Sequence, residues 1–401
     1  MTDGGSPAQQ RGARSVSDRV RGGWAALTRG ITPPIALVLA AASVLAAVPT
    51  LRPYGADLDS NWAIGVTQAF GKGLRFGYDI MFTYGPWAFL DVLNAASIGM
   101  LLPGVLVWLV TGVAIVLVAW RLAQGWLRPL PAAVLVALVV APALAIPHFQ
   151  SGYSARILVL AVMVSIGFAV RTLPAAWVTR AVVTLAVASM LAVETKFSNG
   201  LLALATTFLI AVLAPDRAVR ARLVTVGWMA LASAVAGVGF WLGAGQQLGD
   251  ILPWLRGSYE LMTGYAEAMA IFEGTSLGGT VIAALLTIAL AVLTFSRVRS
   301  WPADWPVVAL AAWGTFLALR LGFTRIDGIH LSQTFILLLG VAIAIGVERR
   351  AWSGVLSSVV ATCLVFVGSQ VSYFGIIDPA VELHVPQDSA DTRNDAVCAG
   401  W

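Results

Sequence analysis

The chain has 401 residues, of which 59% are hydrophobic and only 11% charged, and its formal net charge is +5. Apolar runs of roughly 17 to 24 residues recur between residues 31 and 374, and each is about long enough to cross the hydrocarbon core of a bilayer. This composition excludes a soluble globular domain. The basic balance is explained by membrane topology, so we expect no nucleic-acid partner.

The apolar runs predict an all-α fold, a polytopic bundle of about eleven transmembrane spans. In chain order the spans lie near residues 31–51, 97–120, 130–147, 157–174, 178–195, 200–214, 223–243, 278–296, 306–321, 331–347 and 352–374. The bundle region, residues 31–377, then has outer loops at 52–96, 196–199, 244–277 and 322–330. We interpret residues 1–30 as a disordered basic cytoplasmic tail without a signal-peptide pattern, and 378–401 as a short outer tail.

The charged residues favour one orientation of this bundle. If the N-terminus is cytoplasmic, the inner segments hold 16 of the 25 Lys and Arg residues but only 5 of the 20 acids. The inner face then carries +11 and the outer face −6, which is the positive-inside pattern. We therefore expect a multi-pass protein of the inner (plasma) membrane, with its C-terminus outside and its chemistry on the outer face.

The two cysteines predict neither a disulfide nor a metal site. Cys363 lies within the last predicted span and Cys398 in the tail after it, so the two are expected at different depths. The sequence has no CxxC or Cys/His ligand spacing, which argues against a disulfide scaffold and a thiolate metal site.

The first outer segment, from residue 52 to residue 93, is far longer than a connection in a compact bundle requires. It opens with the paired acids Asp57 and Asp59. Apolar residues then recur at helical spacing at Trp62, Val66 and Phe70, which predicts a short amphipathic helix on the membrane surface. Asp59 or the neighbouring serine is expected to cap that helix.

A run rich in aromatic residues follows, from Gly77 to Trp87. Its aromatic side chains alternate with Gly and Pro, a pattern suited to the wall of a pocket at the level of the lipid headgroups. Asp79 and Tyr84 are its candidate substrate-binding residues.

A second outer segment, residues 193–200, carries Glu194 and Lys196 at the end of an apolar span. Ionisable groups at such a position are costly unless they are paired or face a watery cavity. Two interpretations stay open. Lys196 is either a functional cation or a side chain that reaches the interface and pairs with Glu194.

A third outer segment, residues 320–330, places two arginines, an Asp and a His at the end of a span. The guanidinium fork matches phosphate oxygens, so Arg325 and His330 are candidate ligands of an anionic group, although His330 also fits a structural role. Arg256, in an expected surface helix near residues 253–260, is a further candidate that equally fits a lipid-facing position.

The sequence resembles the GT-C class of integral-membrane glycosyltransferases, in particular uncharacterised bacterial, often actinobacterial, members. Three features carry the resemblance: the span plan, the paired acids of the first outer loop, and the run Gly77 to Pro86. The resemblance implies a polyprenyl-phosphate sugar donor whose lipid lies between spans, and an acceptor that is a glycan, lipid or protein of the cell envelope. It implies that Asp57 or Asp59 is the catalytic base or a metal ligand. It assigns phosphate binding to Lys196 and Arg325. Many members carry a large soluble domain after the spans, which this sequence does not show.

The chemistry of sugar transfer makes these assignments reasonable. A carboxylate that takes the proton of the acceptor hydroxyl typically contributes about 100- to 10,000-fold. Cations stabilise the charge that grows on the departing phosphate. Paired acids also suit an oxygen-ligated Mg²⁺ or Mn²⁺ ion. The alternative for Asp57 and Asp59 is helix capping with ordinary solvation.

Two other function classes remain open. A lipid or small-molecule transporter, or a flippase, would also be all-helical, but it would show ionisable residues within spans or broken helices. A non-enzymatic envelope-assembly protein would use the outer ionisable groups to bind a partner. The discriminating observation is whether Asp59, Lys196 and Arg325 approach one cavity.

Overall fold

The computed structural model describes residues 30–47, 58–92, 98–145, 152–215, 217–268, 277–298, 303–323 and 328–346. Within these ranges the secondary structure is helical, apart from two isolated bridges, between Phe76 and Ile80 and between Tyr84 and Lys196. The predicted all-α class is thus confirmed for the described part of the chain.

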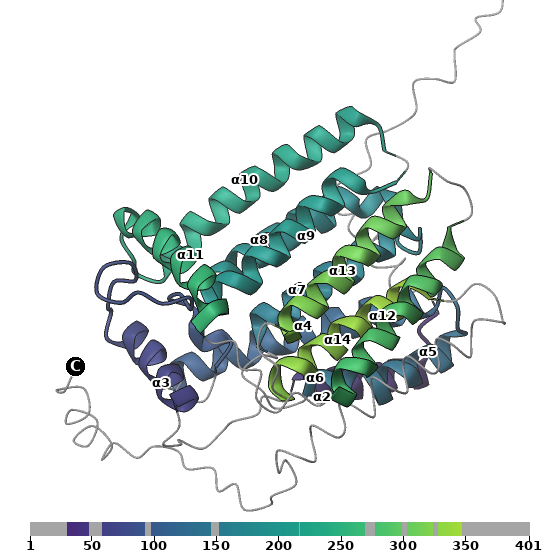
Figure 1. Cartoon of the computed structure of the whole chain (residues 1–401), viewed down its shortest axis with the longest axis horizontal. Coiled ribbons are helices and arrows are strands. Elements are labelled where there is room, and N and C mark those ends of the chain that lie inside the picture. Colours follow the sequence, from purple (N-terminus) through teal and green to yellow (C-terminus); the bar gives the residue numbers. More distant parts are fainter. Residues whose placement is uncertain are drawn as a thin grey trace, which may run out of the picture.

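The bundle consists of mostly apolar helices, most of them long, that run roughly side by side (Figure 1). They are α2 (Pro33–Ala47), α4 (Ile98–Ala123), α5 (Pro129–Leu135), α6 (Ala141–Ala145), α7 (Tyr153–Ala169), α8 (Val178–Thr195), α9 (Phe197–Leu213), α10 (Val219–Gly243), α12 (Leu277–Arg297), α13 (Trp305–Phe323) and α14 (Gly328–Ile345). A turn of π-helix, η4 (Val136–Val140), joins α5 to α6, and a short 3-10 helix, η5 (Ala175–Trp177), precedes α8.

Five of these helices, α4, α8, α10, α12 and α13, are long and apolar enough to cross a membrane, and five apolar stretches of 10–17 residues accompany them. Such helices indicate a membrane-embedded protein. Ten of the eleven apolar runs that predict spans coincide with bundle helices, and the run at 352–374 lies outside the described residues.

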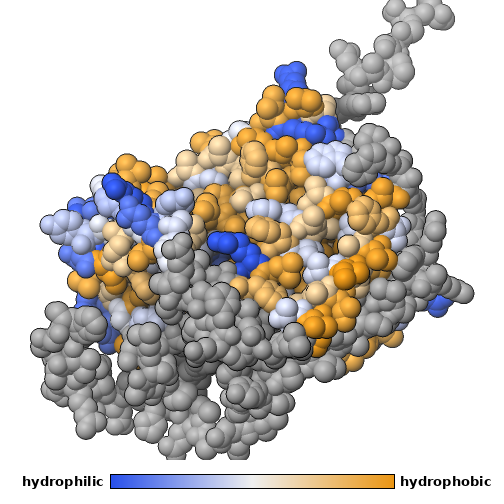
Figure 2. Space-filling view, viewed as in Figure 1, coloured by the Kyte–Doolittle hydropathy of each residue, from blue (hydrophilic) through white to orange (hydrophobic). Residues whose placement is uncertain are grey.

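α7 forms the centre of the bundle. It packs against α4, α8, α9, α13 and α14, and almost every one of its side chains is buried. A helix that is apolar and buried on all sides belongs to a core. By contrast, α10 lies at the periphery against α8 and α9, and much of its length is exposed. Apolar side chains cover the flank of the bundle (Figure 2), as expected for a surface that faces lipid.

The remaining elements gather at one end of the bundle, which we call the loop end. They are α3 (Leu58–Gly71), the short 3-10 helices η2 (Ala88–Leu90) and η6 (Leu248–Asp250), and α11 (Ile251–Ala268) (Figure 1). The Arg-rich connection between α9 and α10 lies at the opposite end. The predicted amphipathic helix after the first span and the predicted helix near residues 253–260 thus correspond to α3 and α11.

The loop end has a small apolar core of its own, separate from the core of the bundle. α3 contributes Val66 and Ala69, the segment after α3 contributes Phe76 and Tyr84, and α11 contributes Trp254. This second core holds the first outer segment in a defined conformation against the ends of α8, α9 and α10.

Candidate functional site

Polar contacts fasten the first outer segment to the connection between α10 and α11, which includes η6. The Arg75 guanidinium donates to both carboxylate oxygens of Asp250, at 2.8 and 2.6 Å. The Gln246 side chain accepts from the backbone N–H of Phe76 and donates to the carbonyl of Leu74. The bidentate guanidinium holds the pKa of the Asp250 carboxyl below its usual range. We call this set of contacts the latch.

Gly77 explains how the segment turns so close to α11. Its φ of +92° is a conformation that side-chain-bearing residues rarely adopt. A Cβ atom at this position would lie 2.5 Å from the Asp250 carbonyl oxygen and 2.8 Å from the Trp254 nitrogen. The first glycine of the aromatic run is therefore required both by its backbone angle and by a close approach.

The aromatic run then crosses the junction of α8 and α9 and pairs with it through the backbone. The N–H of Phe197 donates to Thr83 at 2.8 Å, and the N–H of Trp87 donates to the Glu194 carbonyl at 3.2 Å. This antiparallel bridge sets Tyr84 opposite Lys196, the extended residue that separates the two helices. Two predicted site residues, 112 positions apart in sequence, are thus adjacent.

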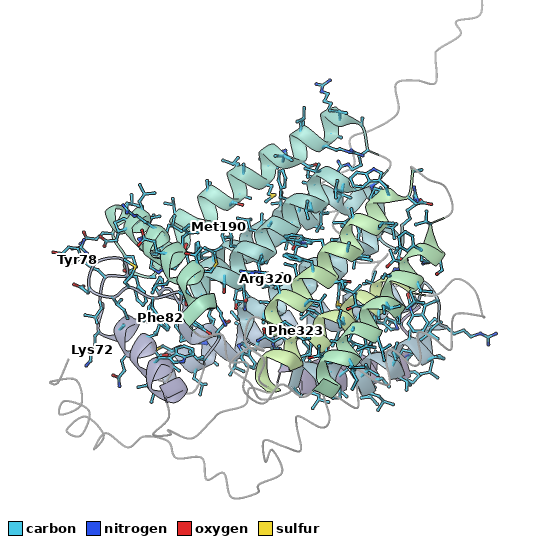
Figure 3. The ribbon with its side chains drawn as sticks, viewed as in Figure 1. Lys72, Tyr78, Phe82, Met190, Arg320 and Phe323 are labelled. Carbon is cyan, nitrogen blue, oxygen red and sulfur yellow. The ribbon has the colours of Figure 1, made fainter. Side chains whose placement is uncertain are left out.

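The Lys196 side chain lies over the ring of Tyr84, which belongs to a cluster of aromatic rings. Its ammonium nitrogen lies 5.1 Å from the centroid of the Tyr84 ring, within cation–π range. Tyr84 is 5% exposed, and its ring is stacked on Phe82 and tilted against Trp62 of α3, with centroids 5.7 and 4.5 Å away. Lys72, Tyr78 and Phe82 lie at this same end of the molecule (Figure 3). The loop end thus places a cation beside an aromatic surface.

The structure shows no ion pair between Glu194 and Lys196, both of which it describes. It is buried in the last turn of α8, and its Oε2 atom has no hydrogen-bond partner among the described residues. Lys196 instead lies within electrostatic range of Asp91.

Asp91 connects the first outer segment to the start of α7. Its carboxylate accepts from the Ser154 backbone N–H at 2.7 Å and from the Ser154 hydroxyl at 2.6 Å. These contacts satisfy a free N–H in the first turn of α7 and place a negative charge at the positive end of the helix. Burial raises the pKa of the Asp91 carboxyl, and the hydrogen bonds from Ser154 lower it in part. Asn199 extends the network by donating to the Ser154 hydroxyl.

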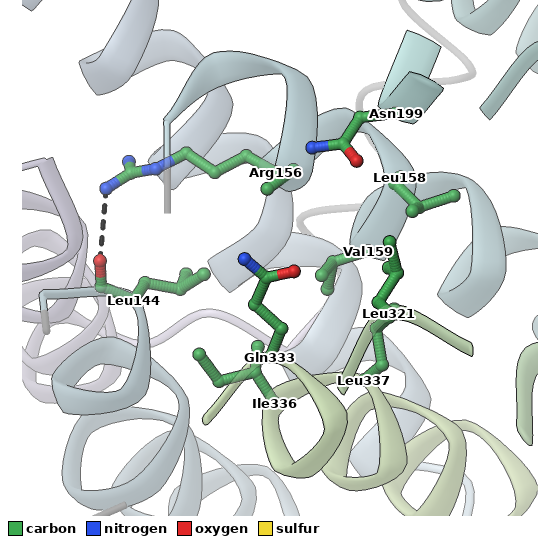
Figure 4. A pocket seen from close by; sticks show the side chains of 10 residues that line it. Leu144, Arg156, Leu158, Val159, Asn199, Leu321, Gln333, Ile336 and Leu337 are labelled. Atoms are coloured by element: carbon green, nitrogen blue, oxygen red, sulfur yellow. Dashed lines mark hydrogen bonds between the residues drawn. The ribbon is translucent and has the colours of Figure 1, made fainter. Parts of the chain in front are cut away.

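Arg156, two residues further along α7, is buried within the bundle and only 1% exposed. Its guanidinium donates to the carbonyls of Trp108 and Leu144 and lies 4.3 Å from the centre of the Trp108 ring. Together with Asn199 and Gln333 of α14 it lines a cavity of about 30 Å³ whose other walls are aliphatic (Figure 4).

Asp79 and Arg256 are placed elsewhere on the loop end. Asp79 is exposed and accepts a hydrogen bond from the backbone N–H of Arg75, so it closes the turn next to the latch. Arg256 points outward from α11, with a side chain that is 83% exposed and paired to Glu260. Their contacts in the structure are local to their own elements.

The other candidates lie outside the part of the chain whose side chains the structure describes. Asp57 and Arg325 lie outside the described residues, and for Asp59 and His330 only the helical backbone is described. Because α3 begins at Leu58, Asp59 lies in the first turn of that helix and not at its N-cap. Among the residues that the structure describes, no group of three His, Cys, Asp or Glu side chains forms a metal site. The Mg²⁺ or Mn²⁺ site at Asp57 and Asp59 stays a prediction.

Sequence reasoning did not select the buried polar residues Asp91, Ser154, Arg156, Asn199 and Gln333. One signal was available: Arg156 falls at the start of an apolar span, where a charge is costly. The others come from four separate segments and become neighbours only in the fold.

No family model, curated protein or solved structure matched the chain.

Proposed function

We propose that the protein is a membrane glycosyltransferase that moves a sugar from a polyprenyl-phosphate-linked donor to a cell-envelope acceptor on the outer face. The observation that supports this best is the position of Lys196, at the end of an apolar helix, over the Tyr84 ring, which itself packs against the half-buried rings of Phe82 and Trp62. Aromatic faces bind the apolar faces of sugar rings, and an ammonium group binds phosphate. A donor with its lipid between helices would present both groups at this depth.

In the proposed reaction, the oxygen of an acceptor hydroxyl attacks the anomeric carbon of the donor sugar. The bond between that carbon and the phosphate oxygen breaks, and polyprenyl phosphate leaves with the electron pair. Lys196 stabilises the charge on the leaving phosphate. The acceptor proton passes to a carboxylate of the first outer segment, which we assign to Asp57 or Asp59.

A transporter or flippase is the second candidate, and one observation favours it. Arg156, Asn199 and Gln333 place polar groups around a cavity inside the bundle, and η4 interrupts the regular α-helix between α5 and α6. Buried ionisable groups and irregular helices are features of transport pathways. This candidate predicts that the protein moves a substrate across the membrane without transferring a sugar.

In the deciding experiment, membranes that contain the overproduced protein receive a radiolabelled polyprenyl-phosphate sugar as donor and an envelope extract as acceptor. Transfer of label to the extract is expected, and membranes from a deletion strain should lack it. Asp57→Asn separates catalysis from capping, because Asn caps a helix about as well as Asp but accepts no proton, and Asp59→Asn makes the same loss of a proton acceptor within the first turn of α3. Transfer that falls about 100-fold or more in one of the two, with normal protein levels, supports the base assignment. Full transfer in both variants contradicts the mechanism.

A further inference from the structure

Three arginines gather where α9 ends and α10 begins, at the end of the bundle opposite the loop end. Residues 216–222 contain Arg217, Arg220 and Arg222 against a single acid, Asp216, which lies outside the described residues. None of the three arginines pairs with a described carboxylate, and α10 has no acidic residue in its first turn. Because the start of a helix carries a partial positive charge, cations destabilise it and an anion stabilises it. The local charge therefore favours a negative ligand.

The protein holds two of these guanidinium groups in place with few of their donors. Arg217 donates to the Thr179 hydroxyl of α8 at 3.1 Å, and Arg222 donates to the Ala214 carbonyl at the end of α9 at 3.4 Å. The Nη1 atom of Arg217 and the Nε atom of Arg222 have no hydrogen-bond partner among the described residues. A guanidinium has five N–H donors. Since both residues are partly exposed, a ligand can reach the donors that remain from outside the protein.

The two arginines belong to one junction of helices. The Thr179 hydroxyl, which accepts from Arg217, is also hydrogen-bonded to the Thr225 hydroxyl at 2.9 Å. Thr225 lies about one turn beyond Arg222 on α10, so the two share the face of α10 that meets α8 and α9. Both guanidinium groups are thus anchored where the three helices meet.

A role in topology alone does not explain these contacts. The positive-inside pattern depends on the number of Lys and Arg residues near the ends of spans, and it requires no fixed orientation of their side chains. A guanidinium that is oriented by hydrogen bonds presents a planar fork of donors, which matches the oxygens of a phosphate group. The chemistry of the pair is that of a phosphate site.

Exposed apolar side chains next to the arginines indicate which phosphate. Val219 and Leu223 are 70% and 66% exposed, and Trp228, further along α10, is 53% exposed. Hydrophilic and hydrophobic side chains adjoin over this end of α10 (Figure 2). A phospholipid fits both parts of this surface, with its headgroup at the arginines and its acyl chains along the helix. A free phosphate ion would use the arginines alone.

We propose that Arg217 and Arg222 bind the phosphate of an anionic phospholipid in the membrane leaflet at this end of the bundle. The bound lipid fastens the start of α10, a peripheral helix, to α8 and α9. The inference does not depend on sugar transfer, and it holds equally if the protein transports its substrate.

The test is native mass spectrometry of the full-length protein, delipidated in detergent and titrated with one lipid at a time. The probes are phosphatidylglycerol and phosphatidylcholine with identical acyl chains. Phosphatidylglycerol should fill one saturable site with an affinity about tenfold or more above that of phosphatidylcholine, and millimolar inorganic phosphate should not displace it. Equal affinity for the two lipids overturns the proposal. Displacement by inorganic phosphate also overturns it, since the site would then bind the free ion.

Substitutions of single arginines localise the site. Arg217→Gln and Arg222→Gln should each lower the affinity for phosphatidylglycerol about fivefold or more. Arg220→Gln is the matched control, because it removes the same charge from an exposed side chain of the same segment, and it should stay within about twofold of wild type. Arg222→Lys keeps the charge without the fork and should lose part of the affinity. Equal losses in Arg220→Gln and Arg222→Gln would show general attraction to a basic surface and overturn the assignment.

Discussion

At the scale of single residues, the basic side chains of the loop end carry the same charge but lie in different surroundings. Lys196 is fixed by a backbone bridge and lies over an aromatic ring, whereas Arg256 extends from α11 into an exposed pair with Glu260. An exposed pair of this kind contributes little to stability, because water screens it. A cation held against an aromatic ring, as Lys196 is, is pre-organised for a ligand.

This difference makes Lys196 and Arg256 a matched pair for a donor-use experiment. Lys196→Ala should lower donor use about ten- to a hundredfold, because a charge-assisted contact to phosphate is typically worth about 1.5–3 kcal/mol. Lys196→Arg should restore part of the activity. Arg256→Ala should leave the rate of sugar transfer within about twofold of wild type. Equal losses in the two alanine variants would argue against a phosphate site at Lys196.

Asp91 and Asp79 form a second pair, with one carboxylate buried and one exposed. Asp91→Ala leaves the backbone N–H of Ser154 without its acceptor and removes a negative charge from the start of α7. We expect a loss of about 1–3 kcal/mol in the free energy of unfolding. Asp79→Ala should change it by less than about 0.5 kcal/mol. Chemical unfolding in detergent micelles measures both changes. An unchanged free energy of unfolding in Asp91→Ala would show that the contacts of Asp91 with Ser154 do not stabilise the fold.

At the scale of elements, the latch decides how the segment after α3 lies on the connection between α10 and α11. The segment has no regular hydrogen-bonded helix between Gly71 and Ala88, so its conformation depends on contacts with other elements. Arg75, Phe76 and Gly77 supply these contacts through one ion pair, one backbone hydrogen bond and one close approach.

The latch is expected to open in acid. The Arg75 guanidinium lowers the pKa of Asp250, so the ion pair is complete above the ordinary carboxyl pKa of about 4 and is lost as the pH falls through the lowered value. Hydrogen exchange at Phe76 and Gly77, corrected for the intrinsic rate, should stay slow from pH 7 to about 5 and accelerate below about 4. Asp250→Asn should exchange fast throughout, while Glu260→Gln should behave like wild type. Slow exchange in Asp250→Asn would show that the ion pair does not hold the segment.

At the scale of the whole molecule, the fold separates two chemically different ends. The described acidic side chains lie at the loop end with one exception, Asp304, which pairs with Arg171. The connection between α9 and α10, with Arg217, Arg220 and Arg222, lies at the other end. This distribution agrees with the orientation that the positive-inside pattern predicts.

Cysteine labelling in intact cells tests that orientation. In a variant with both native cysteines replaced, Lys72→Cys should react with a membrane-impermeant maleimide, because Lys72 is exposed at the loop end. Arg220→Cys, exposed at the opposite end, should react only after the membrane is permeabilised. The reverse pattern would place the loop end in the cytoplasm and would exclude chemistry on the outer face.

The sequence by itself determined the helical membrane class, ten helix positions in the bundle and the two helices α3 and α11, because hydrophobic periodicity and span length are local properties of the chain. It also indicated that Tyr84 and Lys196 belong to unusual segments, since an aromatic run and a charge at the end of a span can be recognised from the sequence alone. Their adjacency was decided by the tertiary structure, through a backbone bridge between residues 112 positions apart. The same holds for Asp91, Ser154, Asn199 and Gln333, ordinary polar residues in four segments. Burial makes them significant, because an apolar interior requires each polar group to find a partner.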